Sequence, residues 1–272
     1  MTGATDHDLK IELALLVDKV RRAGALAQHL KNQGLIISYK PDGSIVTNAD
    51  LEVNLWLKEA LLEARPDYGW QSEESPDTEA RLACKNLFVL DPIDGTMGFS
   101  KGSPYWTIAL ALVRDHRPVA AVVYAPDVQE MYSAYLGGGV WLNGEPVHET
   151  QTVELEYAQS IGDARLFFRD IWKEGWPKME VSSRPSVAYR MVAVAAGRAD
   201  FTLALTPKRD WDVAAATLIA EEAGAKVSNH LGKGYDFNRP DTLKTSLICS
   251  NSKLYPEILR RCEHLGEHPE SY

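Results

Sequence analysis

The segment LFVLDPIDGT, residues 87–96, constrains the fold of this chain more than any other. Its first four residues are apolar, which is the pattern of a buried strand, and Pro92 restricts the backbone where we expect that strand to stop. Asp91 and Asp94 would then project from one short corner. Two carboxylates about 4 Å apart repel each other by about 4 kcal/mol at an effective dielectric of 20. The corner therefore predicts a hard divalent cation between them.

Gly95 and Thr96 follow directly and predict the start of a helix at the same corner. The backbone N–H groups at a helix start lack intrahelical partners and favour a bound anion. A cation and an anion held at one corner indicate metal-assisted phosphate chemistry.

The composition excludes several classes of protein. Hydrophobic residues make up 45% of the 272 positions and charged residues 25%, as in an ordinary globular protein. No apolar run is long enough to span a bilayer. The formal net charge of −9 argues against a nucleic-acid partner, because duplex binding requires a basic face. An acidic chain that handles phosphates needs a bound metal, since each divalent ion locally reverses the sign of the site.

The ends and the cysteines bear on localisation. The first six residues lack the basic and apolar regions of a signal peptide, so we do not expect export. Cys84, Cys249 and Cys262 are odd in number and widely scattered, which fits a reducing environment better than a disulfide framework. They also lack metal-ligand spacing. We therefore expect a cytoplasmic protein without a zinc site built from cysteines.

Hydrophobic periodicity predicts an α+β arrangement in the first half of the chain. Helices are expected at residues 8–33 and 49–64, with a strand at 35–39 and a turn at Pro41-Asp42-Gly43 between them. The later strands of this half follow one another closely, and Asn143-Gly144 predicts a tight turn. Both features indicate that these strands form an antiparallel meander. These later strands are expected at residues 106–113, 119–124, 130–136 and 140–142.

After about residue 150, helices and strands alternate. This alternation predicts an α/β half at residues 151–272 that follows an α+β half at residues 1–150, with the active site between them. The strands of the second half are expected at residues 158–161, 201–205 and 247–249, and its helices at residues 164–173, 186–196 and 212–223.

Further acidic residues lie where strands or helices begin. Asp50 opens the second helix, Glu73 and Glu74 follow a break in the pattern, and Asp212 lies at the start of helix 212–223. An acidic residue near a helix N-terminus is ordinarily a cap or a partner of the helix dipole. That is the simplest interpretation of Asp212 taken alone.

Taken together, these segments resemble the inositol monophosphatase superfamily. Its signatures are a Glu-Glu pair, the sequence Asp-Pro-Ile-Asp-Gly-Thr and the sequence Trp-Asp-Val-Ala-Ala. The resemblance extends from about Lys40 to Ser250, and the second signature matches completely at residues 91–96. It implies an α/β fold, a layered αβαβα sandwich of the inositol monophosphatase and fructose-1,6-bisphosphatase type. It also implies Mg²⁺-dependent, lithium-sensitive removal of phosphate from a small molecule, with two or three Mg²⁺ ions per site.

The resemblance further implies a ligand set. Glu73, Asp91 and the carbonyl of Ile93 would hold one Mg²⁺ and its reactive water. Asp91, Asp94 and Asp212 would hold a second Mg²⁺, which takes the phosphate and the leaving oxygen. Two cations a few ångströms apart can serve both ends of an in-line displacement.

The same resemblance implies catalytic roles for Glu73, Asp50 and Thr96. Glu73 holds the reactive water through its metal, while Asp50 and Thr96 form the pair that draws a proton from that water. A metal lowers the pKa of bound water toward neutrality, so no strongly basic side chain is required. The backbone N–H groups of Gly95 and Thr96 would receive the phosphate.

The substrate is less constrained. Met97-Gly98-Phe99 departs from the Thr-Asn-Phe of many inositol monophosphatases, and residues 208–212 resemble bacterial 3'(2'),5'-bisphosphate nucleotidases. We therefore expect a bisphosphate nucleotidase first and an inositol-1-monophosphatase second, followed by a histidinol-phosphate or sugar phosphatase. Some basic residues are candidates to hold a second phosphate, although each is equally consistent with a solvated surface charge. These residues are Lys208, Arg209, Arg184 and Arg190.

A different class remains open, namely a catalytically silent homologue that binds a macromolecule. Such a homologue would be expected to lose at least one site residue, and all six are present, which favours an enzyme. The expected partner is a small phosphate ester, without nucleic acid or membrane, and a homodimer remains an open alternative. The six residues are Glu73, Asp91, Asp94, Asp212, Asp50 and Thr96.

Overall fold

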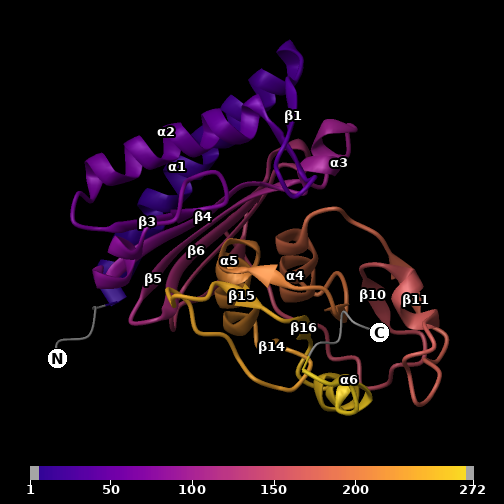
Figure 1. Cartoon of the computed structure of the whole chain (residues 1–272). Helices are drawn as coiled ribbons and strands as arrows, with labels where there is room; N and C mark the ends of the chain where they lie inside the picture. Colours follow the sequence, from indigo (N-terminus) through magenta and orange to yellow (C-terminus); the bar gives the residue numbers. More distant parts are fainter. Residues whose placement is uncertain (1–5, 268–272) are drawn as a thin grey trace.

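Helices and sheets alternate in five layers in the computed structural model, which describes residues 6–267 (Figure 1). Helices α1 (Asp6–Gln33) and α2 (Asn48–Ala64) cover one face of a seven-stranded sheet. Helices α4 (Val187–Ala195) and α5 (Asp210–Glu222) lie between that sheet and a five-stranded sheet. Helix α6 (Tyr255–Cys262) packs on the far face of the second sheet. The αβαβα sandwich implied by the resemblance is confirmed.

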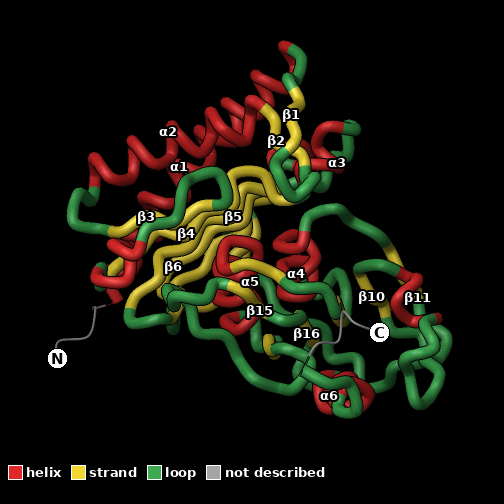
Figure 2. The backbone as a smooth tube through the Cα atoms, in the orientation of Figure 1, coloured by secondary structure: helices red, strands yellow, loops and turns green. Residues whose placement is uncertain are grey.

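The seven-stranded sheet has its strands in chain order (Figure 2). The pairs from β4 to β9 are antiparallel, so the predicted meander is confirmed. Strand β3 pairs with β4 in parallel, which the sequence did not reveal. The strands are β3 (Gly69–Ser72), β4 (Asn86–Asp94), β5 (Thr107–Arg114), β6 (Arg117–Ala125), β7 (Glu130–Tyr135), β8 (Gly139–Leu142) and β9 (Glu145–Pro146).

Strand β4 is apolar on both sides because both faces of its sheet are covered. Phe88 and Leu90 pack toward α1 and α2, whereas Leu87 and Val89 pack toward α4 and α5. The expectation that the strand stops at Pro92 is wrong. Strand β4 continues to Asp94, with an irregular register between Asp91 and Asp94 where the ladder to β5 is interrupted.

The second sheet has the order β11-β10-β12-β16-β14 and mixes parallel and antiparallel pairs. Its strands are β10 (Gln159–Ile161), β11 (Glu180–Ser182), β12 (Phe201–Ala204), β14 (Lys226–Ser228) and β16 (Leu247–Ser250). Two small ladders complete the strands. They are β1 (Ile37–Tyr39) with β2 (Ile45–Thr47), which encloses the predicted turn, and β13 (Lys208–Arg209) with β15 (Leu243–Lys244).

The predicted helix at 164–173 is wrong. Only a short 3-10 helix, η3 (Ala164–Phe168), forms there. The side chain of Trp172 turns back to donate its indole N–H to the carbonyl of Leu166 at 2.7 Å, and its ring packs edge-on against Trp176. Aromatic packing in the third core cluster therefore competes with continuation of the helix. The other short helices are η1 (Glu79–Ala83), η2 (Pro126–Val128) and α3 (Thr96–Ser100).

Helix α5 is apolar almost all round because it lies between the two sheets. Residues 213–220 are all buried, and the small side chains of Ala214, Ala215 and Ala216 allow close approach of neighbouring backbones. The core around α5 includes residues from both sides of position 150, and the division into two halves at that position remains our proposal. The three cysteines form no disulfide. Within residues 6–267, no helix is both long enough and apolar enough to span a membrane.

Candidate active site

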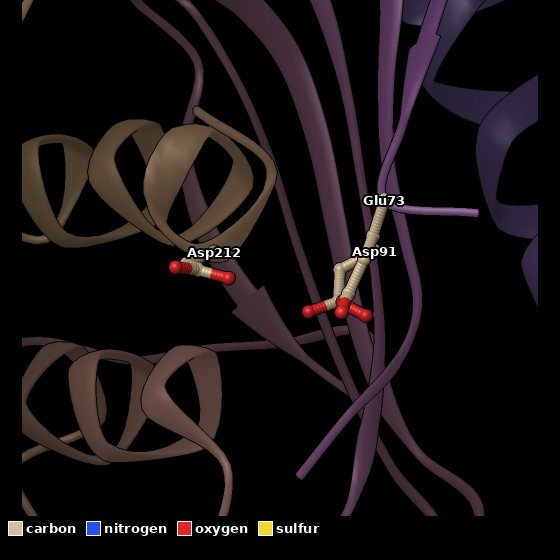
Figure 3. A group of neighbouring side chains, drawn as sticks. All are labelled: Glu73, Asp91 and Asp212. Atoms are coloured by element: carbon tan, nitrogen blue, oxygen red, sulfur yellow. The ribbon is translucent and has the colours of Figure 1, made fainter. Parts of the chain in front are cut away.

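Three carboxylates from distant parts of the sequence meet at one end of the first sheet. Glu73 follows β3, Asp91 lies on β4 and Asp212 lies in the first turn of α5 (Figure 3). One oxygen from each lies within 4.8 Å of the others. Figure 3 shows Glu73 and Asp91 side by side on the sheet, with Asp212 facing them from the helix.

In Asp91 and Asp212, one oxygen of each carboxylate accepts a hydrogen bond from a backbone N–H. The backbone N–H of Ile93 donates to Asp91 Oδ1 at 3.1 Å, and the backbone N–H of Arg209 donates to Asp212 Oδ2 at 2.7 Å. In the described chain, no group donates a hydrogen bond to Asp91 Oδ2 or to Asp212 Oδ1. Each carboxylate is thus oriented by its own backbone and keeps one oxygen for another partner.

Asp94 is anchored in the same way, but by the other half of the chain. Its Oδ2 accepts hydrogen bonds from the hydroxyl of Ser186 and from the backbone N–H of Ala188, both at 2.6 Å. Ser186 is the N-cap of α4 and also accepts from the backbone N–H of Tyr189 at 2.8 Å. Asp94 therefore joins the irregular end of β4 to the start of α4.

The electrostatics of this cluster favour a bound cation. Burial raises the pKa of Asp212 to about 7, with Asp94 and Glu73 adding repulsion. Burial also raises the pKa of Asp91 well above its usual value, and Glu73, Asp94 and Asp212 raise it further. The pKa of Asp94 is raised by burial, despite its hydrogen bonds from Ser186 and Ala188. Buried and half-buried carboxylates that repel one another and have free oxygens fit a hard divalent ion.

Lys40 contacts this cluster from the β1–β2 hairpin. Its Nζ lies 2.6 Å from Oε1 of Glu73 and 2.6 Å from Oε1 of Glu74. Burial alone would lower the pKa of Lys40, but the hydrogen bonds to both carboxylates raise it above its usual value. The ammonium therefore remains charged and offsets part of the negative charge. Sequence reasoning gave this lysine little weight, because a single lysine carries no local pattern.

Thr96 and Asp50 are in direct contact. The Thr96 hydroxyl lies 2.9 Å from Asp50 Oδ1 and 2.9 Å from the carbonyl oxygen of Ile93, and it can donate to either. The other oxygen of Asp50 accepts from the backbone N–H of Thr47 at 2.8 Å, in the capping box of α2. Burial raises the pKa of Asp50. Asp50 is therefore both the N3 residue of this capping box, whose N-cap is Thr47, and the hydrogen-bond partner of Thr96.

Gly95 allows the end of β4 to approach the segment before α4 closely. Its φ of 90° lies in the left-handed region, and a Cβ there would lie 3.0 Å from the backbone nitrogen of Ser186. Thr96 then begins α3, as the sequence predicts, although this helix has only five residues.

The four basic candidates separate into two groups. Arg190 and Lys208 line one pocket, and Asp94 attracts both of them electrostatically. Arg184 instead stacks on the ring of Tyr105, with 4.1 Å from its guanidinium carbon to the ring centroid. Arg209 is exposed and donates to the Thr242 hydroxyl at 3.2 Å. The structure does not bring Arg184 or Arg209 into that pocket.

A comparison with known protein families decides the family. Residues 8–267 match the model of the inositol monophosphatase family. The chain belongs to the inositol monophosphatase family. It is therefore a phosphatase of a family that hydrolyses phosphate monoesters. The family predicted from the sequence motifs is confirmed.

Similar proteins in this family carry different names. Inositol-1-monophosphatase of Rhizobium meliloti (strain 1021) is 30% identical over 269 residues, which cover 92% of this chain and 96% of the relative. A putative Nus factor SuhB of Neisseria meningitidis serogroup A is 30% identical over 257 residues, covering 88% and 93% of the two chains. The crystal structure of the extragenic suppressor protein suhB from Bartonella henselae has a TM-score of 0.81 at 25% identity, covering 93% of this chain and 99% of that one.

Three residues at or near the site were not predicted from the sequence. Ser186 follows Pro185 and precedes an apolar helix, which is an N-cap pattern, but no local signal links it to Asp94. Arg165 and Arg169 lie on the pocket of Arg190, within the segment that the sequence wrongly assigned to one helix.

Proposed function

We propose that this chain is a Mg²⁺-dependent phosphomonoesterase acting on a small phosphorylated metabolite. One observation carries the proposal, namely the convergence of Glu73, Asp91 and Asp212 within 4.8 Å. Together with Asp94 and the carbonyl of Ile93, these residues would hold the ions. When bound, Mg²⁺ supplies positive charge for the phosphate and acidity for the attacking water.

The chain's own residues orient the reacting groups. Asp50 accepts the hydrogen of the Thr96 hydroxyl, so a lone pair of Thr96 Oγ1 faces away from Asp50 and can accept a proton from the attacking water. The raised pKa of Asp50 makes it the stronger base of the pair. The backbone N–H groups of Gly95 and Thr96 are the proposed donors to the phosphate.

For the substrate, we propose a 3'(2'),5'-bisphosphate nucleotide as the first candidate. Arg190 and Lys208 line one pocket and interact electrostatically with Asp94, and such cations suit a substrate with more than one anionic group. Inositol 1-phosphate is the second candidate, supported by the name of the relative in Rhizobium meliloti.

A release assay for inorganic phosphate tests the reaction. The panel comprises 3'-phosphoadenosine 5'-phosphate, inositol 1-phosphate, histidinol phosphate and fructose 1,6-bisphosphate, each with Mg²⁺, with a chelator, and with Mg²⁺ plus lithium. We expect release only with Mg²⁺ and a decrease in lithium. Full activity in the chelator would overturn the proposal. Absence of release from every ester would favour a homologue that binds a macromolecule.

A further inference from the structure

The start of α5 is held by a buried ion pair that lies outside the proposed ligand set. Asp210, the first residue of α5, lies two residues before the proposed metal ligand Asp212. Its Oδ1 lies 2.5 Å from Nζ of Lys244 on β15. Asp210 is 0% exposed and Lys244 is 8% exposed, and no other ion pair within residues 6–267 has both side chains so deeply buried. Removal of two charges from water offsets most of their attraction, so the geometry that this pair imposes explains it better than its stability does.

The strand that carries the lysine also holds the residues that lead into α5. Strand β15 pairs with β13, the two residues directly before the helix. The guanidinium of Arg209 donates to the hydroxyl of Thr242 at 3.2 Å. The backbone N–H of Asn238 donates to the second oxygen of Asp210 at 3.2 Å. The segment 238–244 therefore fixes the start of α5 through backbone and side-chain contacts.

The orientation of Asp212 depends on these residues. Its Oδ2 accepts a hydrogen bond from the backbone N–H of Arg209 at 2.7 Å. A rotation of the first turn of α5 would therefore move this carboxylate relative to Glu73 and Asp91, with which it shares a cluster of 4.8 Å. Side chains that orient metal ligands without binding the metal typically account for about 10- to 100-fold in metal affinity.

The same segment is fixed on its other side to the connection between β3 and β4. Arg81, which is buried in this connection, donates to Asn238 Oδ1 at 2.9 Å and to the carbonyl of Arg239 at 3.0 Å. The side-chain amide of Asn238 donates back to the carbonyl of Arg81 at 3.2 Å. Since this connection begins at Glu73, segment 238–244 joins the parts of the chain that carry Glu73 and Asp212.

We propose that Lys244 is a positioning residue for the metal site. Its ion pair with Asp210 fixes the first turn of α5, and the turn in turn fixes the carboxylate of Asp212. Lys244 acts through Asp210 and is not itself a ligand. The inference rests on the proposed function, because Asp212 is assigned to the metal there.

The sign of the effect separates positioning from charge alone. Lys244→Met keeps an unbranched side chain and removes the cation. If charge alone mattered, loss of a positive charge near the site would strengthen Mg²⁺ binding, because like charges repel. We expect the opposite, namely that the metal-free Lys244→Met protein binds Mg²⁺ about 10- to 100-fold more weakly than the wild type. Calorimetry with Mg²⁺ alone measures this difference and requires no substrate.

Arg65→Met is a matched control for the loss of a partly buried cation. Arg65 forms an ion pair with the buried Glu12 at 2.9 Å, which joins the end of α2 to α1 and involves no proposed ligand. Both variants leave a buried carboxylate without its cation, so thermal unfolding should show a lower Tm for each. The affinity for Mg²⁺ should fall only in Lys244→Met.

A double variant removes the cost of an unpaired buried charge. Asp210→Asn combined with Lys244→Met leaves the net charge unchanged, and the new amide oxygen can still accept from the backbone of Asn238. Its Tm should therefore be closer to that of the wild type than the Tm of Lys244→Met is. Its affinity for Mg²⁺ should remain low, because the contact between the two side chains is still absent.

Three results would overturn the inference. The first is wild-type affinity for Mg²⁺ in Lys244→Met or in the double variant. The second is an equal loss of affinity in Arg65→Met, which would mean that general destabilisation weakens the site. The third is a wild type that binds no Mg²⁺, which would overturn the proposed function as well. Failure of the proposed function is thus visible in the wild type, whereas failure of this inference alone is visible only in the variants.

Discussion

At the scale of single residues, Asp94 has the most constrained environment of the proposed ligands. Its Oδ2 accepts two hydrogen bonds at 2.6 Å, and its side chain is buried. We expect Asp94→Asn to reduce kcat by about 1,000-fold, because the change removes a charge from the site without changing its volume. The amide oxygen can still accept from Ser186 and Ala188, and the loss of one buried charge relieves repulsion in the cluster. The metal-free variant should therefore unfold at the same temperature as the wild type or at a higher one.

An exposed carboxylate provides the control for this charge change. Asp236→Asn removes a surface charge that, among residues 6–267, forms an ion pair with Arg239 alone, at 3.2 Å, and should leave phosphate release unchanged. Most of the wild-type activity in Asp94→Asn would contradict the proposed ligand set.

The hydroxyl of Thr96 allows a similarly specific test. Thr96→Val keeps the branched shape but removes the contact with Asp50, so we expect kcat to fall by about 100-fold or more. Thr96→Ser keeps the hydroxyl and should retain most of the activity. Steady-state phosphate release at saturating Mg²⁺ measures both, and equal losses in the two variants would exclude a role for the hydroxyl.

The sequence indicated these residue types well, because metal-binding carboxylates occur in compact motifs. Asp91 and Asp94 are three residues apart, and the structure brings Glu73 and Asp212 to the same place. The role of Lys40 was underestimated and that of Ser186 was missed, because the contacts of both residues join segments that are far apart in the chain. A motif records local spacing, whereas a contact across the core depends on the packing of the whole fold.

At the scale of elements, the irregular end of β4 connects the fold to the site. Gly95→Ala should destabilise the protein, since the new Cβ would meet the backbone of Ser186 at 3.0 Å and φ is 90°. Gly43 is the matched control, with φ of 84° and no atom within 4 Å of its Cβ position. We expect Gly43→Ala to cost about 1 kcal/mol of unfolding free energy, and Gly95→Ala about 1–2 kcal/mol more.

Chemical denaturation of both variants measures these costs, and kcat should fall only in Gly95→Ala, because a shift of Ser186 moves a partner of Asp94. Equal stabilities in the two variants would mean that the chain relaxes around residue 95 without strain.

Elements with strong periodicity were predictable, and elements governed by packing were not. The two long N-terminal helices and the meander were identified from their apolar patterns, within a few residues of α1, α2 and β5–β8. Strand β3 was missed because four residues carry too short a pattern. The helix expected at 164–173 failed because Trp172 packs against Trp176 instead of continuing the helix.

At the scale of the whole molecule, the site gathers acidic side chains from three distant segments of the chain. The chain carries a net charge of −9, and the cluster brings together the buried Asp91 and the half-buried Asp212, both with raised pKa values. Packing α4 and α5 against the first sheet brings these negative charges together, so their mutual repulsion lowers the stability of the folded state. A bound divalent ion neutralises this repulsion. Metal binding should therefore increase the stability of the whole fold.

This link gives the metal-free protein a distinctive dependence on pH. The pKa of Asp212 is about 7 in the folded state and near 3.8 when unfolded. Between these pH values, Asp212 binds a proton in the folded state but not in the unfolded state. The free energy of unfolding of the metal-free protein should therefore fall as pH rises from about 4 to about 7. The raised pKa values of Asp91 and Asp94 act in the same direction. Mg²⁺ competes with these protons and should stabilise the protein more at pH 7.5 than at pH 5.

Thermal unfolding with and without Mg²⁺ at the two pH values measures this difference. At a hundredfold excess over Kd, we expect Mg²⁺ to raise Tm by about 5–10 °C at pH 7.5 and by much less at pH 5. Asp212→Asn removes one titrating ligand and should reduce both the Mg²⁺ effect and its dependence on pH. If Mg²⁺ raised Tm equally at both pH values, protons and the metal would not share these carboxylates, and the cluster would lose its assignment as the metal site.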